Sequence, residues 1–219
     1  MKHARTCRLG LVLAMAGLFA NPAAAQSWRE TVIAFAQKNL QQGVVYSHSE
    51  RDYALAKNLA AADHVVVDDD VLFAAAYLHD MSDVAFAEPG KDHADVAATK
   101  IDMVLAGTDF PQAKLDQVRA AIRTHMFFRT PVGPEALYLH DADTLEQLGA
   151  SGLARSLELV DSNGGKPTGP QMMKAYGNTK IIEDGVLSAA GKSELARRLA
   201  EQKAFLDALS RETDGFKAL

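Results

Sequence analysis

The 219-residue sequence has little of several features that mark common protein classes. It contains one cysteine, Cys7, so no disulfide framework can form within the chain. Aromatic residues make up only 7% of it, and the alternation of Val, Ile and Thr with polar residues that is typical of β-strands is scarce. These shortages disfavour sandwiches, barrels and doubly wound sheets, and we expect a globular, helical protein.

Positive charge is also in short supply. Lys and Arg total 23 against 28 Asp and Glu, which gives a net charge of -5. Binding to a nucleic-acid backbone needs a basic surface, so a nucleic-acid duplex is disfavoured as a partner. An anionic substrate would need local cations, from a metal or from a few Lys and Arg side chains, to offset the acidic surface.

The first 25 residues follow the three-part plan of a secretory signal peptide. A basic start precedes an apolar run, Leu9 to Ala20, and small residues lead to Ala25. The run is shorter than the about 20 residues that a membrane-spanning helix needs, and no later stretch approaches that length. We therefore expect cleavage between Ala25 and Gln26, and a secreted or periplasmic protein without a membrane span.

Cleavage at that point would change the composition of the chain. It would remove Cys7 and three basic residues but no acidic residue, so the net charge would go from -5 to -8. The mature protein would then contain no cysteine. Its stability has to come from a hydrophobic core, which about 190 residues can supply.

Apolar residues recur at helical spacing along most of the mature chain. The pattern predicts helices over residues 28–40, about 48–59, 71–79, about 94–105, 115–125, 134–148 and about 195–209. The acidic triplet Asp68-Asp69-Asp70 precedes the third helix and is interpreted as its cap rather than as a metal site. Residues 161–170 are predicted to form a loop, and their Gly-Gly-Lys lacks the spacing of a phosphate-binding loop.

Three histidines share helix faces with apolar residues: His48, His79 and His125. One such histidine alone would be interpreted as a hydrogen-bonded core residue. Three on separate helices favour a different interpretation, because each buried ring needs partners for its nitrogens. A divalent cation is one partner that all three can share.

Carboxylates accompany these histidines. Asp80 directly follows His79 at the expected C-terminal end of its helix, where the helix dipole opposes a negative charge and burial without a partner is costly. Asp141 and Asp143 point about 200° apart on a helix, so only one of them can face the core, and spacing favours neither. His48, His79, Asp80 and one of these acids form a mixed N/O set that suits Mn, Fe, Co, Ni or Zn rather than Ca.

The order His, then His-Asp, then Asp resembles that of the HD-domain metal-dependent phosphohydrolase superfamily. The resemblance runs from about residue 43 to about residue 156. Its patterns are His48-Ser49-Glu50-Arg51, Tyr77-Leu78-His79-Asp80, Ala121-Ile122-Arg123-Thr124-His125, and Asp141-Ala142-Asp143-Thr144-Leu145 followed by Gly149 to Arg155. It implies an all-α helical bundle around a metal site, with His48, His79, Asp80 and Asp143 as the ligands.

The expected organisation has three parts. The signal peptide covers residues 1–25, and an HD-type metal-binding helical domain covers residues 26–160. Residues 161–219 form a loop and a C-terminal helical extension that packs on the same domain. A homodimer is compatible with this organisation.

A second similarity concerns the number of ions. The segment His93-Ala94-Asp95-Val96-Ala97-Ala98 is similar to the helix start of dinuclear members, although Ala97 stands where glycine is usual. His125 matches another ligand position of that set. The resemblance therefore implies one ion and leaves open a second ion held by His93 and His125. The alternative interpretations make His93 a solvated residue and His125 a substrate-facing residue beside a single ion.

The activity that the resemblance implies is hydrolysis of a phosphate monoester, diester or anhydride by a metal-activated water. The substrate would be a nucleotide-like or other small phosphorylated metabolite. Asp83 matches the position of an acid that orients the water or takes up its proton. Arg51, one turn from His48, is a candidate to neutralise phosphate charge, and Lys91, Arg123 and Arg155 are weaker ones.

The sequence leaves two alternative functions open, and two further histidines have other interpretations. One alternative is a di-iron oxygenase of the same superfamily, and the other is a periplasmic metal-binding protein without turnover. His64 is interpreted as a surface loop residue. His140 is interpreted as solvated, or as a residue that contacts a metal ligand.

Overall fold

The computed structural model describes residues 27–40, 45–161, 169–170, 172–173, 182–217 and 219, and every regular element within these ranges is helical. The expected all-α fold is confirmed. The predicted signal peptide and most of the predicted loop at residues 161–170 lie outside the described residues. No helix in the described part of the chain is both long and apolar enough to cross a membrane.

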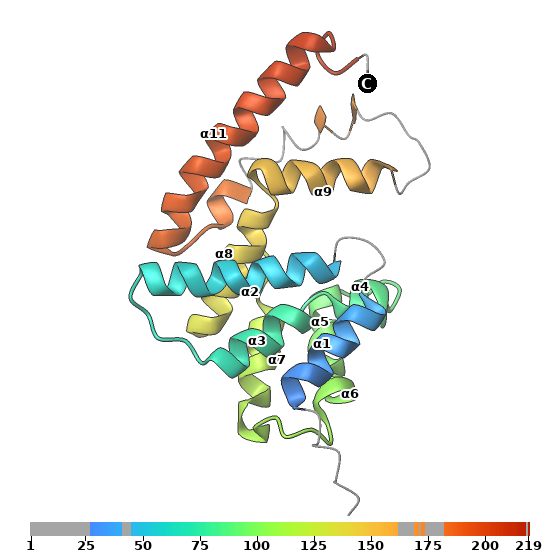
Figure 1. Ribbon diagram of the computed structural model, residues 1–219, viewed down its shortest axis with the longest axis vertical. Helices are drawn as coiled ribbons and strands as arrows, with labels where there is room; N and C mark the ends of the chain where they lie inside the picture. The colour runs from blue at the N-terminus through green and yellow to red at the C-terminus, as the bar shows by residue number, and fades with distance from the viewer. Residues whose placement is uncertain (1–26, 41–44, 162–168, 171, 174–181, 218) are drawn as a thin grey trace, which may run out of the picture.

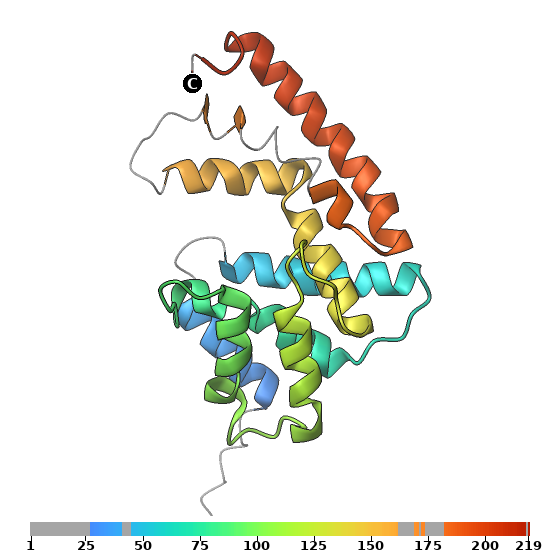
Figure 2. The same cartoon turned by 180° about the vertical axis from the view of Figure 1, so that it is seen from behind.

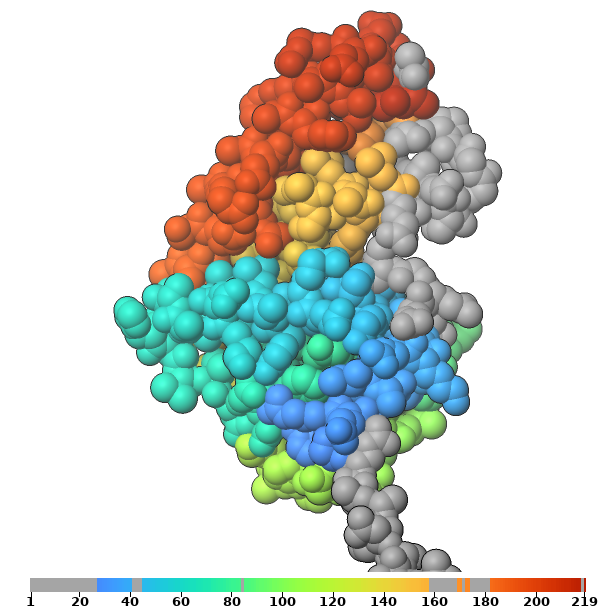
Figure 3. Space-filling view, in the orientation of Figure 1, coloured from blue at the N-terminus to red at the C-terminus, as the bar shows by residue number. Residues whose placement is uncertain are grey.

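The helices fall into a body and an extension. The body contains α1 (Trp28–Asn39), α2 (Val45–Ala62), α3 (Asp69–Leu78), α4 (Met81–Val84), α5 (His93–Lys100), α6 (Asp102–Leu105), the 3-10 helix η1 (Gln112–Lys114), α7 (Leu115–Arg123) and α8 (Pro134–Glu146). The extension contains α9 (Gly149–Asp161) and α11 (Ala189–Glu212). Helix α8 leads from the body into the extension, which projects beyond α2 (Figures 1, 2 and 3).

Helix α3 is the centre of the body. All its residues from Val71 to Leu78 are buried, and it packs against α1, α2, α7 and α8. The predicted cap is confirmed, because the Asp68 carboxylate accepts hydrogen bonds from the backbone N–H groups of Asp70 and Val71. A helix that is apolar on every side must be enclosed by others, and its C-terminal end therefore lies deep inside the bundle.

Trp28, the one tryptophan of the sequence, holds α1 against this core. Its ring is 7% exposed and meets Phe73 and Phe110 edge-on, with centroids 5.5 and 4.9 Å away. Edge-to-face geometry places the positive edge of one ring on the negative face of another. The start of α1 is fixed as well, because Ser27 and Glu30 form a capping box.

Two helix predictions need correction. The helix predicted over residues 94–105 is divided at Ile101, where a turn separates α5 from α6. The helix predicted over residues 115–125 ends at Arg123, because the backbone N–H and hydroxyl of Thr124 bond to carbonyl groups of the last turn. His125 therefore lies beyond the helix and not on its face.

Helix α9 was not predicted, because its first residues contain glycine and serine. Gly152 is needed there for a close approach rather than for a turn. A Cβ at this position would lie 2.3 Å from the carbonyl oxygen of Gln147 at the end of α8. Glycine thus lets α9 begin directly after α8.

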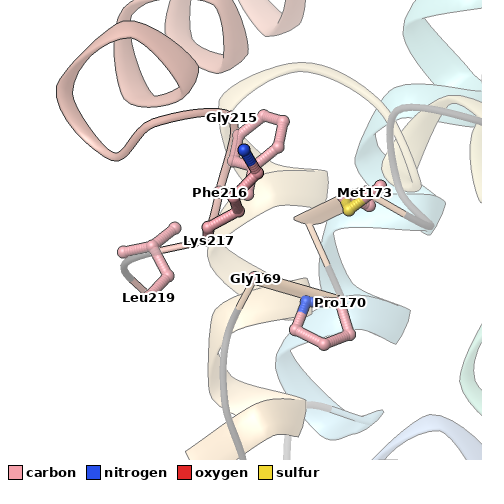
Figure 4. A pocket seen from close by; sticks show the side chains of 7 residues that line it. All are labelled: Gly169, Pro170, Met173, Gly215, Phe216, Lys217 and Leu219. Atoms are coloured by element: carbon pink, nitrogen blue, oxygen red, sulfur yellow. The ribbon is translucent and has the colours of Figure 1, made fainter.

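A pocket of about 320 Å³ lies in the extension (Figure 4). It is lined by Gly169, Pro170, Met173, Gly215, Phe216, Lys217 and Leu219. This lining contains none of the candidate metal ligands. The candidate site lies instead within the body.

Candidate metal centre

Side chains from distant segments meet at the C-terminal end of α3. His48 comes from the first turn of α2, Asp143 from α8, and His79 and Asp80 from the residues that follow α3. His48 Nε2 lies 3.0 Å from Asp143 Oδ1 and 3.7 Å from Asp80 Oδ2, and His79 Nε2 lies 3.3 Å from Asp80 Oδ2. The structure thus brings together all four residues of the predicted first site.

A second group lies on the other side of Asp80. His93 is the first residue of α5, and His125 lies in the segment after α7. Their Nε2 atoms are 3.2 Å apart, and each is 3.6 Å from Asp80 Oδ1. Asp80 therefore presents one carboxylate oxygen to His48 and His79 and the other to His93 and His125.

Backbone carbonyls orient two of the imidazoles. His79 Nδ1 lies 2.9 Å from the carbonyl oxygen of Ala76, and His125 Nδ1 lies 2.6 Å from that of Ile122. A carbonyl oxygen only accepts, so Nδ1 carries the proton and donates in both rings. In the neutral ring this leaves a lone pair on Nε2 directed at the cluster, which is the arrangement that metal-ligating histidines use.

The electrostatics of the cluster favour a positive charge. Burial would lower the pKa of His48, but the carboxylates of Asp52 and Asp143 outweigh it and raise that pKa to about 10. Burial would also lower the pKa of His79, but the carboxylate of Asp80 outweighs it and raises that pKa to about 9. Burial also opposes ionisation of Asp80 and Asp143, yet the facing histidines lower the pKa of each. The ionised carboxylates therefore favour a positive charge at the cluster, which protonated histidines supply here and a bound cation would supply in their place.

Buried atoms without hydrogen-bond partners also favour a cation site. Among the described residues, His79 Nε2 and both carboxylate oxygens of Asp52 are buried without a hydrogen bond. Leaving such an atom unpaired costs about 1–3 kcal/mol. One ligand atom from each of His48, Asp52, His79 and Asp143 lies within 4.8 Å of all the others, so a single ion could satisfy them together. The residues fit a divalent metal.

Asp141 and Asp143, the two alternatives on α8, have different contacts. Asp143 faces His48, whereas Asp141 accepts hydrogen bonds from the backbone N–H groups of Leu187 and Ser188 just before α11. His140, interpreted from sequence as solvated or in contact with a metal ligand, is fully buried, and its Nδ1 lies 3.2 Å from Asp141. The solvated interpretation is wrong, because α8 is enclosed on most sides.

Asp83 lies at the edge of the cluster. Its carboxylate, on the short helix α4, is exposed, and one of its oxygens lies within 4.8 Å of ligand atoms of Asp80 and His93. Partial burial of the carboxyl group and the neighbouring charge of Asp80 raise the pKa of Asp83. The position suits a group that exchanges protons with a bound water.

Arg51 has a different environment. Its Nε donates a hydrogen bond of 2.5 Å to Glu146, and its side chain is 40% exposed. Glu146 also pairs with Arg198 of α11 at 3.3 Å and lies 4.0 Å from His48 Nδ1. Arg51 therefore lies on the side of His48 that faces away from the ligand cluster.

Sequence reasoning missed two acids of this site, Asp52 and Glu146. Asp52 lies one turn after His48 on α2, and Glu146 lies one turn after Asp143 on α8. Residues three or four apart share a helix face, so a search for acids at that spacing from each candidate ligand would have found both.

Comparison with known proteins bears on the same residues. The family model of the HD domain matches residues 45–148, which run from the start of α2 to just beyond α8 and include every candidate ligand. Residues 45–148 are an HD domain. No curated protein matches the chain.

Solved structures share the fold of this HD domain and of much of the rest of the chain. A predicted HD superfamily hydrolase from an uncultured Thermotogales bacterium is 23% identical with a TM-score of 0.59, covering 84% of this chain and 91% of its own. An HD-superfamily hydrolase from Bacillus thuringiensis is 21% identical with a TM-score of 0.65, covering 85% and 96%. Bacillus subtilis YpgQ in complex with ADP is 15% identical with a TM-score of 0.66, covering 86% and 100%.

Proposed function

We propose that this protein is a metal-dependent phosphohydrolase that cleaves a phosphate monoester, diester or anhydride in a nucleotide-like or other small phosphorylated metabolite. The observation that carries the proposal is the position of Asp80, whose two carboxylate oxygens each face a pair of histidines. The ADP complex of YpgQ supports a phosphorylated ligand for this fold.

The distances within the cluster support a set of ligands. His48, His79, Asp80 and Asp143 would hold one ion, and His93 and His125 would hold a second together with Asp80. When bound, a divalent Mn, Fe, Co, Ni or Zn lowers the pKa of water and polarises a phosphoryl oxygen. Imidazole and carboxylate donors suit all five of these metals.

Other side chains complete the chemistry. Asp83 is placed to accept the proton of the attacking water, because its carboxylate is accessible and its raised pKa makes it a better base than an ordinary Asp. Arg51 pairs with Glu146 on the side of His48 away from the ligands, so its proposed contact would be with an anionic part of the substrate remote from the metal. If His93 does not hold an ion, the role of His125 is to contact the substrate.

The test is loss of metal and turnover in single variants. His79→Ala or Asp80→Ala should abolish both metal content and hydrolysis of a panel of nucleotides, sugar phosphates and phosphodiesters. The helical circular dichroism should be largely retained. Asp116→Ala serves as a control, because that side chain is 97% exposed and its loss should change neither property. Retained turnover in either site variant would refute the assignment.

The two-sided position of Asp80 also suits a di-iron oxygenase, which is the second candidate. Dependence of turnover on dioxygen, with a mixed-valence iron signal, would favour that function. Metal binding without turnover of any compound in the panel would favour a binding protein instead.

The cellular setting is part of the proposal. The signal-peptide pattern of residues 1–25 supports secretion or export to the periplasm. The substrate would then be a small phosphorylated compound outside the cytoplasm. Homodimerisation stays a prediction.

A further inference from the structure

Asp52 is a buried acid that the predicted ligand set does not include. It lies on α2 one turn after His48, and it is fully buried. Its Oδ2 lies 3.1 Å from His48 Nε2 and 3.6 Å from His79 Nε2. It therefore faces the same two ring nitrogens as the carboxylates of Asp80 and Asp143.

Three other buried acids in the described part of the chain have donors that account for their burial. Asp141 accepts two backbone N–H groups, Glu146 pairs with two arginines, and Glu135 accepts the backbone N–H of Asp68. Within the described part of the chain, neither oxygen of Asp52 has a hydrogen bond. The nearest cationic partner of Asp52 is the His48 ring, 3.1 Å away, and that ring is itself a candidate metal ligand.

The neighbouring imidazoles cannot satisfy Asp52 while they bind a metal. His79 donates through Nδ1 to Ala76, so its neutral ring presents a lone pair on Nε2. A carboxylate oxygen 3.6 Å from such a nitrogen is repelled unless a positive charge lies between them. The same holds for His48 when its Nε2 serves as a ligand.

We propose that Asp52 is an additional ligand of the ion held by His48, His79, Asp80 and Asp143. The inference rests on the proposed metal site, and it extends the set to three carboxylates and two imidazoles. Five protein ligands would exceed the tetrahedral set that zinc prefers and would suit a six-coordinate ion that also binds one water. The site then favours Mn or Fe over Zn.

The experiment compares metal binding in the full-length mature protein, with Mn²⁺ alone and Zn²⁺ alone as the probes. Asp52→Asn keeps the shape of the side chain but removes the charge. We expect its Mn²⁺ affinity, measured by calorimetry, to fall by at least about tenfold, with a smaller loss for Zn²⁺.

Two further variants keep the test decisive. Asp52→Leu replaces the carboxylate with an apolar side chain of similar size, in case the amide disturbs folding. Asp63→Asn is the matched control, because Asp63 lies just after α2 and accepts hydrogen bonds from Ala190 N–H and the Tyr138 hydroxyl. It should lower the thermal midpoint and leave both metal affinities unchanged.

The outcomes separate this inference from the proposed function. Unchanged Mn²⁺ affinity in both Asp52 variants overturns the role of Asp52 and leaves the metal site standing. Equal losses for Mn²⁺ and Zn²⁺ show that Asp52 acts only through its charge, which also overturns ligation. If the unaltered protein binds neither ion, the proposed function fails together with the inference.

Discussion

At the scale of single residues, the position of Asp80 bears on how many ions the site could hold. Its Oδ2 faces His48 and His79, and its Oδ1 faces His93 and His125. A carboxylate can bridge two cations in this way only when each oxygen has its own set of further ligands. Two histidines on each side of Asp80 are the candidates for these further ligands.

His93→Ala tests the second ion. We expect the unaltered protein to take up two equivalents of metal and the variant to take up one, because the ligands on the Oδ2 side remain complete. Metal analysis after dialysis gives the count. One equivalent in both proteins would show that His93 holds no ion, and that His125 faces the substrate instead.

Some residues of this site can be predicted from the sequence, and others cannot. His48, His79 and Asp80 are predictable because their order in the chain resembles a known pattern and they fall where helices pack. Spacing could not separate Asp141 from Asp143, and only the resemblance favoured Asp143, because their contacts depend on where Leu187 and Ser188 come to lie, more than forty residues later in the chain. Helical spacing alone does not carry that information.

At the scale of elements, ion pairs join α1 to α3 at the edge of the body. Arg29 of α1 contacts the carboxylates of Asp69 and Asp70, and Lys57 of α2 also contacts Asp69. Partial burial alone would raise the pKa of Asp69, but hydrogen bonds from Lys57, Tyr53 and Arg29 lower it to about 2. The ionised carboxylate therefore stabilises the folded state.

The ion pairs of Asp69 predict how the free energy of unfolding depends on pH. A carboxylate with a lowered pKa in the folded state stabilises it above the unfolded-state pKa, which is about 3.9. That stabilisation should be lost as the pH falls from about 4 toward the folded-state pKa of about 2. Because Asp69 and its partners are partly exposed, we expect their ion pairs to contribute only about 0.2–1 kcal/mol to the free energy of unfolding.

The measurement is the thermal midpoint between pH 2 and pH 7. Asp69→Asn should be less stable than the unaltered protein at pH 7, and the difference should disappear near pH 2. The exposed Asp116→Asn provides the baseline. A constant difference across this range would mean that Asp69 stabilises the fold through its shape rather than its charge.

Helix limits show why local patterns predict elements better than their ends. The apolar period located α1, α3 and α8 closely, because tertiary packing reinforces it. It carried the helix before His125 two residues too far, because Thr124 closes α7 with its own hydroxyl. This error matters for the site, since a residue beyond the helix end can turn its ring toward Asp80.

At the scale of the whole molecule, Glu146 connects the extension to the candidate metal centre. Arg198 of α11 donates to Glu146 and to the Leu145 carbonyl, and Glu146 lies 4.0 Å from His48 Nδ1. The start of α11 is held closely as well, because a Cβ on Gly191 would meet Asp141 Oδ2 at 2.5 Å. The extension thus packs directly behind the ligands of α2 and α8.

The N-terminus carries a prediction for the intact protein. Expression with the full leader in a bacterium that has a periplasm should yield a mature chain that begins at Gln26, because the small residues before it suit signal peptidase. Mass spectrometry of the intact protein gives the start residue. A product that keeps residues 1–25 in the cytoplasm would contradict both the cleavage site and the proposed setting.

The single indole of this chain makes the molecule its own optical reporter. Because Trp28 is enclosed by Phe73 and Phe110 and no second indole competes with it, excitation near the red edge of protein absorption observes only the junction of α1 and the core. A shift of its emission to longer wavelength on heating then shows the temperature at which α1 separates from the core. Comparison with circular dichroism shows whether that release precedes the melting of the remaining helices.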